Sequence, residues 1–136
     1  MTAHALIVSP LYVGLCALIF FWLSVLVIRR RAIHRTWFGD GGHADLQRAI
    51  RVQANCAEYT PLALLVIVVL EAAGYRPWIV HALGMALVVG RILHAWGLAR
   101  SASASAGRFV GINLTFLVLA VGGVLLIWCF VRNAAL

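Results

Sequence analysis

Four strongly polar side chains recur at helical spacing within residues 46–62, which read LQRAIRVQANCAEYTPL. They are spaced three, four and three residues apart and are Arg48, Arg51, Asn55 and Glu58. On a helix of about 100° per residue, this spacing places all four within a sector of roughly 80°. Two guanidinium groups can hold carboxylates, and a carboxylate can hold an ammonium group. The pattern predicts a site for a zwitterionic ligand with additional carboxylates.

Two further polar residues, Tyr59 and Gln53, lie near this site in the sequence, and the site also has a purely structural interpretation. Tyr59 lies at the edge of the polar sector, whereas Gln53 points to nearly the opposite side of the helix and requires a different partner. Alternatively, Arg51 and Glu58 neutralise each other, with Asn55 between them, in a purely structural network. The residues alone leave both interpretations open.

The chain that carries these residues is strongly apolar and basic. Of its 136 residues, 64% are hydrophobic and the mean hydropathy is +1.00, well above the usual values for a soluble domain. We therefore expect one integral membrane domain over residues 1–136. All 11 basic residues are arginines, and they lie at the ends of apolar runs. This placement favours membrane lipid or an anionic ligand as partner and excludes nucleic acid.

Cysteines and histidines give no sign of a metal site. The three cysteines are isolated within apolar runs: Cys16, Cys56 and Cys129. Without any CxxC spacing we expect small buried hydrophobes, although a reactive Cys56 stays open. On one helix His81 and His94 diverge by roughly 140°, so they cannot hold a haem together. We expect His81 to be a satisfied core histidine and the protein to need no metal.

Four apolar runs predict an all-α bundle of four transmembrane helices, at about residues 10–28, 46–73, 78–98 and 109–131. The first run is followed by arginines instead of preceded by them, so it is a retained span and not a secretory signal. Asp45 is the expected N-cap of the second helix, and Pro61 is expected to kink it. Small residues at Gly111, Gly122 and Gly123 are expected to let the fourth helix approach its neighbours closely.

The arginine distribution predicts the orientation. Nine arginines flank the loops after the first and third spans, whereas Arg76 and Arg132 lie at the opposite ends. The positive-inside rule places both loops in the cytoplasm and both termini outside. The polar face of the second span, Arg91 and His94 of the third, and Arg108 at the start of the fourth then meet at one cytoplasmic level. We therefore add Arg91 and His94 to the ligand-binding residues.

The run RAIRVQANCAEYTPL resembles the signature of the MAPEG family, the membrane-associated proteins of eicosanoid and glutathione metabolism. It is especially similar to the leukotriene C synthase and microsomal glutathione transferase members, and the resemblance extends over essentially the whole chain. It implies a homotrimer of four-helix subunits, with glutathione bound as a co-substrate between neighbouring subunits. The overall pattern is most similar to the bacterial members, which implies the bacterial inner membrane.

The resemblance also implies roles for individual residues. One subunit would hold glutathione through four residues: Arg51, Asn55, Glu58 and Tyr59. Gln53 and Arg30 would reach in from the next subunit, which accounts for the direction of Gln53. Arg108 matches the catalytic arginine that stabilises the glutathione thiolate. The family's eicosanoid enzymes carry tyrosines in the third span where this chain has His94 and Leu98, so His94 becomes the candidate substitute.

Three functions follow from these residues. The leading hypothesis is a glutathione-dependent transferase or peroxidase that acts on a lipophilic electrophile from the bilayer. The second is a small proton-coupled transporter in which Glu58 alternates between a proton and a cation, although the nearby arginines would repel that cation. The third is a MAPEG-fold protein that binds ligands without catalysis.

Overall fold

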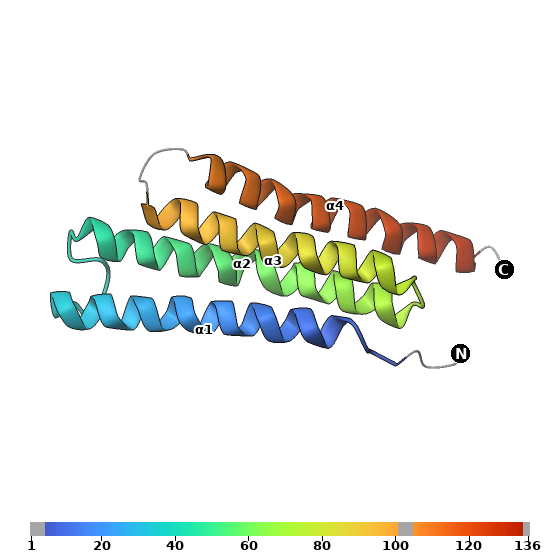
Figure 1. The fold of residues 1–136 in the computed structure, drawn as a ribbon, viewed down its shortest axis with the longest axis horizontal. Coiled ribbons are helices and arrows are strands. Elements are labelled where there is room, and N and C mark those ends of the chain that lie inside the picture. The colour runs from blue at the N-terminus through green and yellow to red at the C-terminus, as the bar shows by residue number, and fades with distance from the viewer. Residues whose placement is uncertain (1–4, 101–104, 135–136) are drawn as a thin grey trace.

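The computed structural model describes residues 5–100 and 105–134, which form four long helices packed side by side (Figure 1). They are α1 (Ser9–His34), α2 (Ala44–Ala72), α3 (Pro77–Arg100) and α4 (Ala106–Ala134). Each helix is long and apolar enough to cross a membrane. These helices confirm the predicted all-helical architecture, and the chain is an integral membrane protein. The sequence predicts a linker over residues 99–107, but α3 extends to Arg100 and α4 begins at Ala106, and residues 101–104 lie outside the described residues.

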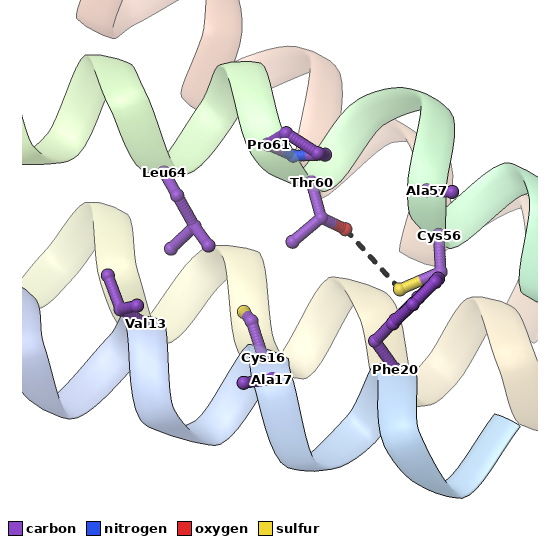
Figure 2. Close-up of a pocket in the computed structure, with 9 residues that line it drawn as sticks. All are labelled: Val13, Cys16, Ala17, Phe20, Cys56, Ala57, Thr60, Pro61 and Leu64. Atoms are coloured by element: carbon purple, nitrogen blue, oxygen red, sulfur yellow. Dashed lines mark hydrogen bonds between the residues drawn. The ribbon is translucent and has the colours of Figure 1, made fainter. Parts of the chain in front are cut away.

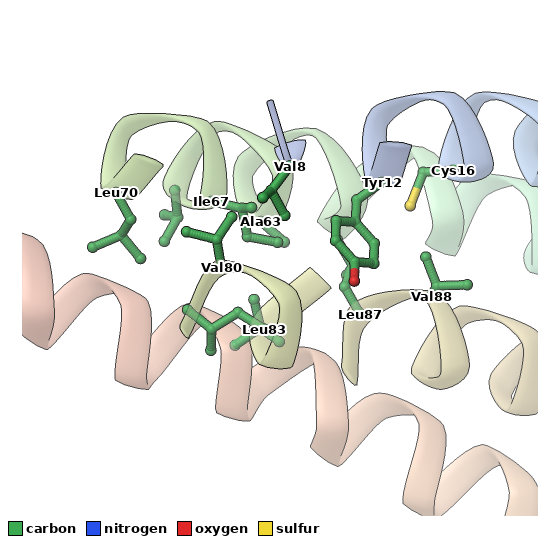
Figure 3. Packing of buried hydrophobic residues seen from close by; sticks show 12 residues of the cluster. Val8, Tyr12, Cys16, Ala63, Ile67, Leu70, Val80, Leu83, Leu87 and Val88 are labelled. Atoms are coloured by element: carbon green, nitrogen blue, oxygen red, sulfur yellow. The ribbon is translucent and has the colours of Figure 1, made fainter. Parts of the chain in front are cut away.

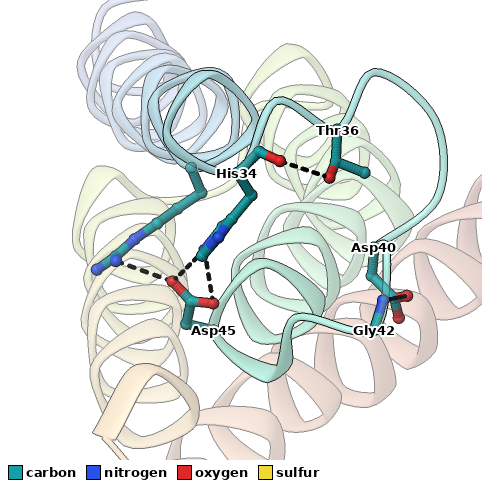
Figure 4. A network of polar contacts seen from close by, with 6 residues as sticks. His34, Thr36, Asp40, Gly42 and Asp45 are labelled. Carbon is teal, nitrogen blue, oxygen red and sulfur yellow. Dashed lines mark hydrogen bonds and ion pairs between the residues drawn. The ribbon is translucent and has the colours of Figure 1, made fainter.

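The connection between α1 and α2 differs from the sequence prediction. Helix α1 continues through its three arginines to His34, because arginine is a good helix former, and it ends at Arg35 in the left-handed conformation (φ 50°). The prediction that Asp45 is the N-cap of α2 was wrong, since the N-cap is His43. The carboxylate of Asp45 instead lies 2.9 Å from Arg30 Nη1 and within 3.0 Å of His34 Nε2 (Figure 4). Asp45 therefore ties the end of α1 to the start of α2.

The main apolar core is formed mainly by residues of α1, α2 and α3 and includes Val118 of α4 (Figure 3). Tyr12 of α1 is 1% exposed and packs against Gly84 of α3, where any added Cβ would collide with the ring. Its hydroxyl lies 2.8 Å from His81 Nδ1. The prediction of a core position for His81 was wrong: its ring is bonded to Tyr12, but the residue is exposed on the bundle surface.

A carboxylate from α2 completes the first turn of α1. Glu71, 7% exposed, accepts hydrogen bonds from the backbone N–H groups of Ile7, Val8 and Ser9 at 2.8, 2.6 and 2.7 Å. These donors have no partner within their own helix, and an anion at a helix N-terminus is stabilised by the helix dipole. Glu71 therefore fixes the beginning of α1 against the end of α2.

Helices α3 and α4 approach so closely that their backbones touch. A Cβ added to Gly111 would lie 2.5 Å from both Gly90 O and His94 N, and one added to Gly97 would lie 2.6 Å from Arg108 N. Glycine is required at these crossings because any larger residue would separate the helices. The expected role of Gly122 is also confirmed, since it packs on Val66 of α2. Gly123 was also expected to allow a close approach of helices, but this was wrong, because a Cβ added there would meet nothing within 4 Å in the described chain.

This contact yields a stability prediction. Gly111→Ala should destabilise the folded protein by about 1–3 kcal/mol, because the new methyl group meets backbone atoms that cannot move independently. Gly123→Ala is the matched control in the same helix, where a Cβ would meet nothing within 4 Å. Thermal unfolding in detergent measures both. Equal stability of the two variants would contradict the close backbone contact.

Candidate functional site

Arg91 joins three helices at the centre of the candidate site. This α3 residue is 2% exposed. Its Nη1 donates to Asn55 Oδ1 of α2 at 2.9 Å, and its Nη2 donates to Thr115 Oγ1 of α4 at 2.6 Å. The Thr115 hydroxyl in turn donates to Gly111 O at 3.1 Å, next to the α3–α4 crossing. The guanidinium is therefore held in one place by α2 and α4.

The charge of Arg91 is buried without an acidic partner among the described residues. Each of the chain's four acidic side chains is engaged elsewhere in the structure: Asp40 with the N–H of Gly42, Asp45 with Arg30 and His34, Glu58 with Arg51, and Glu71 with the start of α1. In the part of the chain that the structure describes, the buried Nε of Arg91 also has no hydrogen-bond partner. A buried unpaired cation is costly, so this position favours an anion in its vicinity.

A cavity between α3 and the start of α4 brings together two of the predicted site residues, His94 and Arg108. His94, one helical turn after Arg91 and 7% exposed, lines a cavity of about 450 Å³ with Ser105, Arg108, Phe109 and Ile112. The glycine contacts between α3 and α4 place the first turn of α4 here. The side chains of an imidazole and a guanidinium thus border one space, where they can hold an anion and exchange a proton.

The outer face of α2 carries the exposed part of the predicted site. Arg51 Nη1 and Glu58 Oε1 lie 4.0 Å apart, with side chains 62% and 50% exposed, so the pair adds little stability by itself. The ring of Tyr59 meets Phe116 of α4 edge to face, with ring centroids 5.6 Å apart. Arg51 and Glu58 therefore remain open to a ligand or a second copy of the chain.

The remaining predicted residues do not line the cavity of His94 and Arg108. They are Arg30, Arg48 and Gln53. Arg30 and Arg48 line a small cavity of about 80 Å³ between α1 and α2, together with Asp45. It shares no lining residue with the cavity of His94 and Arg108. Gln53 is half-buried on α2. A single chain therefore does not assemble all the predicted ligand-binding residues around one space.

A third, apolar cavity of about 280 Å³ lies between α1 and α2 (Figure 2). It is lined by Val13, Cys16, Ala17, Phe20, Cys56, Ala57, Thr60, Pro61 and Leu64. The Sγ of Cys56 lies 3.5 Å from the Thr60 hydroxyl. All three cysteines are free and buried, which confirms the prediction of small buried hydrophobes. The cavity suits a hydrocarbon chain.

Comparison with known proteins identifies the family. The model of the MAPEG family matches residues 9–128. The chain belongs to the MAPEG family. It is 41% identical over 90 residues to the inner membrane protein YecN of Escherichia coli strain K12, covering 66% of this chain and 69% of YecN. It is also 32% identical over 131 residues to the uncharacterized protein sll1147 of Synechocystis, covering 94% of each chain.

Sequence reasoning missed two residues that organise the site of this MAPEG protein. Thr115 is fully buried and holds Arg91, but the only signal was a hydroxyl in an apolar run, four residues after Gly111. Asp45 fixes Arg30, which the sequence assigned to a ligand. The signal for Asp45 was its position as a single carboxylate between two groups of arginines. We interpreted this carboxylate as a helix cap.

Thr115→Val tests the contact that holds Arg91 in this MAPEG protein. The change keeps the shape of the side chain but leaves a buried guanidinium N–H without an acceptor, so the protein should lose about 1.5–3 kcal/mol of stability. Ser24→Ala is the control, because the Ser24 hydroxyl makes a similar bond to Phe20 O on an exposed face. Thermal unfolding in detergent compares them, and equal losses would contradict a special role for Thr115.

Proposed function

We propose that this MAPEG protein is a glutathione-dependent transferase or peroxidase that acts on lipophilic electrophiles. The observation that carries the proposal is the buried cation Arg91, which has no acidic partner among the described residues and lies one helical turn before His94, a lining residue of the cavity that also contains Arg108. A thiolate or carboxylate would supply the missing negative charge. The proposed location is the bacterial inner membrane, supported by the name of YecN, with the site on the cytoplasmic side and both termini outside.

Glutathione offers two carboxylates, an ammonium group and a thiol, which match the groups at the site. Arg51 would bind a carboxylate and Glu58 the ammonium group, because both side chains are exposed and only weakly paired with each other. Asn55 and Tyr59 lie on the same stretch of α2, next to Arg91 and α4. Membership of the MAPEG family supports glutathione as the co-substrate.

A homotrimer would complete the site. Arg30, Arg48 and Gln53 do not line the cavity of His94 and Arg108 in their own chain, and in this proposal they reach the ligand of a neighbouring copy. The exposed faces of α2 that carry Arg51 and Glu58 would then be covered by a neighbouring subunit. Arg30 is bonded to Asp45 in the single chain and would have to turn or share that carboxylate to reach the ligand.

The proposed chemistry begins with the thiol. Arg108 stabilises the thiolate because a nearby cation favours the charged form of sulfur. His94 can accept the thiol proton as the thiolate forms. The thiolate sulfur then donates an electron pair to the electrophilic carbon, a sulfur–carbon bond forms as the bond to the leaving group breaks, and the leaving group departs with that electron pair and takes the proton from His94. The apolar cavity between α1 and α2 supports a lipophilic second substrate. A transporter role for Glu58 is disfavoured by Arg51 beside it.

Arg51→Ala should weaken glutathione binding by about 1.5–3 kcal/mol, or roughly 10- to 150-fold, because a charge-assisted hydrogen bond to a carboxylate is lost. Arg76→Ala is the matched control, since Arg76 is exposed at the opposite end of the bundle. Calorimetry of the detergent-purified protein with glutathione and with its S-hexyl conjugate measures both. Equal losses would mean that overall positive charge attracts the ligand.

Arg108→Ala should act on the thiol more than on affinity. Removing the cation should move the midpoint of the bound thiol's titration upward by about 1–3 pH units, while binding of the S-hexyl conjugate barely changes. The ultraviolet absorbance of the thiolate reports this midpoint, with Arg132→Ala as the control. If the wild-type protein binds glutathione but forms no thiolate near neutral pH, the protein binds ligands without activating them.

A further inference from the structure

Two consecutive aromatic side chains project from the loop between α1 and α2 and do not pack against the bundle. Trp37 is 81% exposed and Phe38 is 96% exposed, the highest values among the exposed large hydrophobic residues of the described chain. Such side chains are stabilised by transfer from water into an apolar or interfacial environment. Two adjacent ones at a loop tip therefore indicate a surface that another phase or molecule covers.

The loop holds these aromatic residues in place through a hydrogen-bonded frame. The Nη1 atom of Arg31 donates to Thr36 O at 3.3 Å and to Gly39 O at 3.0 Å, the carbonyls on either side of the aromatic pair. At the base of the loop, the rings of His34 and His43 stack with centroids 3.9 Å apart. Asp40 accepts the N–H of Gly42 within the turn (Figure 4). Trp37 and Phe38 are thus displayed by an ordered turn.

The length of α1 places this loop at the depth of lipid headgroups. Its 26 residues span about 39 Å, compared with about 30 Å for the hydrocarbon core and about 40–45 Å for the core with both headgroup layers. The three arginines before His34 mark the point where the helix leaves hydrocarbon. Tryptophan is enriched at this level of a bilayer because its ring is apolar and its N–H is polar.

The charge around the loop selects the kind of lipid. Arg29 and Arg35 are exposed in the stretch that leads into the turn closed by Arg31, and the neighbouring acidic groups, Asp40 and Asp45, are engaged within the protein. Each arginine near an anionic membrane surface increases the affinity for that surface by about fivefold. Phosphate groups complement this part of the surface.

We propose that the α1–α2 loop is an interfacial anchor, which inserts Trp37 and Phe38 into the headgroup layer and binds anionic phospholipid through Arg29 and Arg35. The anchor fixes the depth of the arginine-rich end of the bundle. It does not depend on glutathione chemistry, since none of its aromatic or lipid-binding residues contributes to the cavity of His94 and Arg108.

Spin labelling of the full-length protein tests the anchor. A nitroxide is attached at Phe38→Cys in a chain in which the three native cysteines are replaced by alanine, and the protein is placed in vesicles of phosphatidylcholine with phosphatidylglycerol. The label at residue 38 should be several-fold more accessible to oxygen, relative to a water-soluble nickel complex, than a label at Gln47→Cys. Gln47 is an exposed side chain at the start of α2 and serves as the control.

Two results would overturn the proposal. One is equal access of the nickel complex to both labels, which would place the loop in water. The other is spin–spin broadening at residue 38 that persists on dilution with unlabelled lipid, which would mean that a second copy of the chain covers the loop.

A second test measures melting temperatures of proteins that keep the three native cysteines. Replacement of both aromatic residues by alanine should leave the melting temperature in detergent unchanged, because these side chains are almost fully exposed. In nanodiscs, phosphatidylglycerol should raise the melting temperature of the wild type more than that of this variant. Arg35→Gln should weaken the apparent affinity for phosphatidylglycerol by about fivefold. Equal stabilisation of all three proteins by phosphatidylglycerol would overturn the anchor.

Discussion

The backbone contact between α3 and α4 is the constraint on which the candidate site depends. Because Gly90 and Gly111 let the two helices touch, the residues beside them face each other at short range. Arg91 follows Gly90, and Thr115 lies one turn after Gly111, so the guanidinium meets its hydroxyl acceptor at the crossing itself. The same approach continues at Gly97 and Gly107, which places Arg108 beside the helix that carries His94. Small residues therefore decide where the charged ones can meet.

The chain has four acidic residues, and two of them, Asp45 and Glu71, join the ends of α1 and α2. Asp45 closes the α1–α2 connection, Glu71 completes the start of α1, and Glu58 lies exposed beside Arg51. Within residues 5–100 and 105–134, Arg91 is a buried cation whose acceptors, Asn55 and Thr115, are both neutral. In a bilayer such a charge is expensive unless it faces a protein interior or a polar cavity. This distribution concentrates unbalanced positive charge at one level of the bundle.

The sequence allowed the helices to be predicted, because they follow from periodicity along one chain, whereas of the predicted site residues only His94 and Arg108 line the cavity between α3 and the start of α4. The spacing from Arg48 to Glu58 and the four apolar runs needed no knowledge of neighbouring helices. Contacts between helices could not be predicted in this way. Asn55 faces Arg91, and Asp45 faces Arg30, because of how the helices are rotated and offset against each other. Gly123 and His81 show the same limit, since their surroundings depend on which helix face meets a partner.

Glu71 has a consequence for how the protein is made. The first three backbone amides that it binds precede it by 62 to 64 residues, so they leave the ribosome well before their acceptor. At about 5–20 residues per second, this delay amounts to roughly 3–12 s. During that interval the leading end of the first helix carries unsatisfied N–H groups, which are costly in lipid. The N–H groups at the start of the first helix can therefore bind their native acceptor only after the second helix has been synthesised.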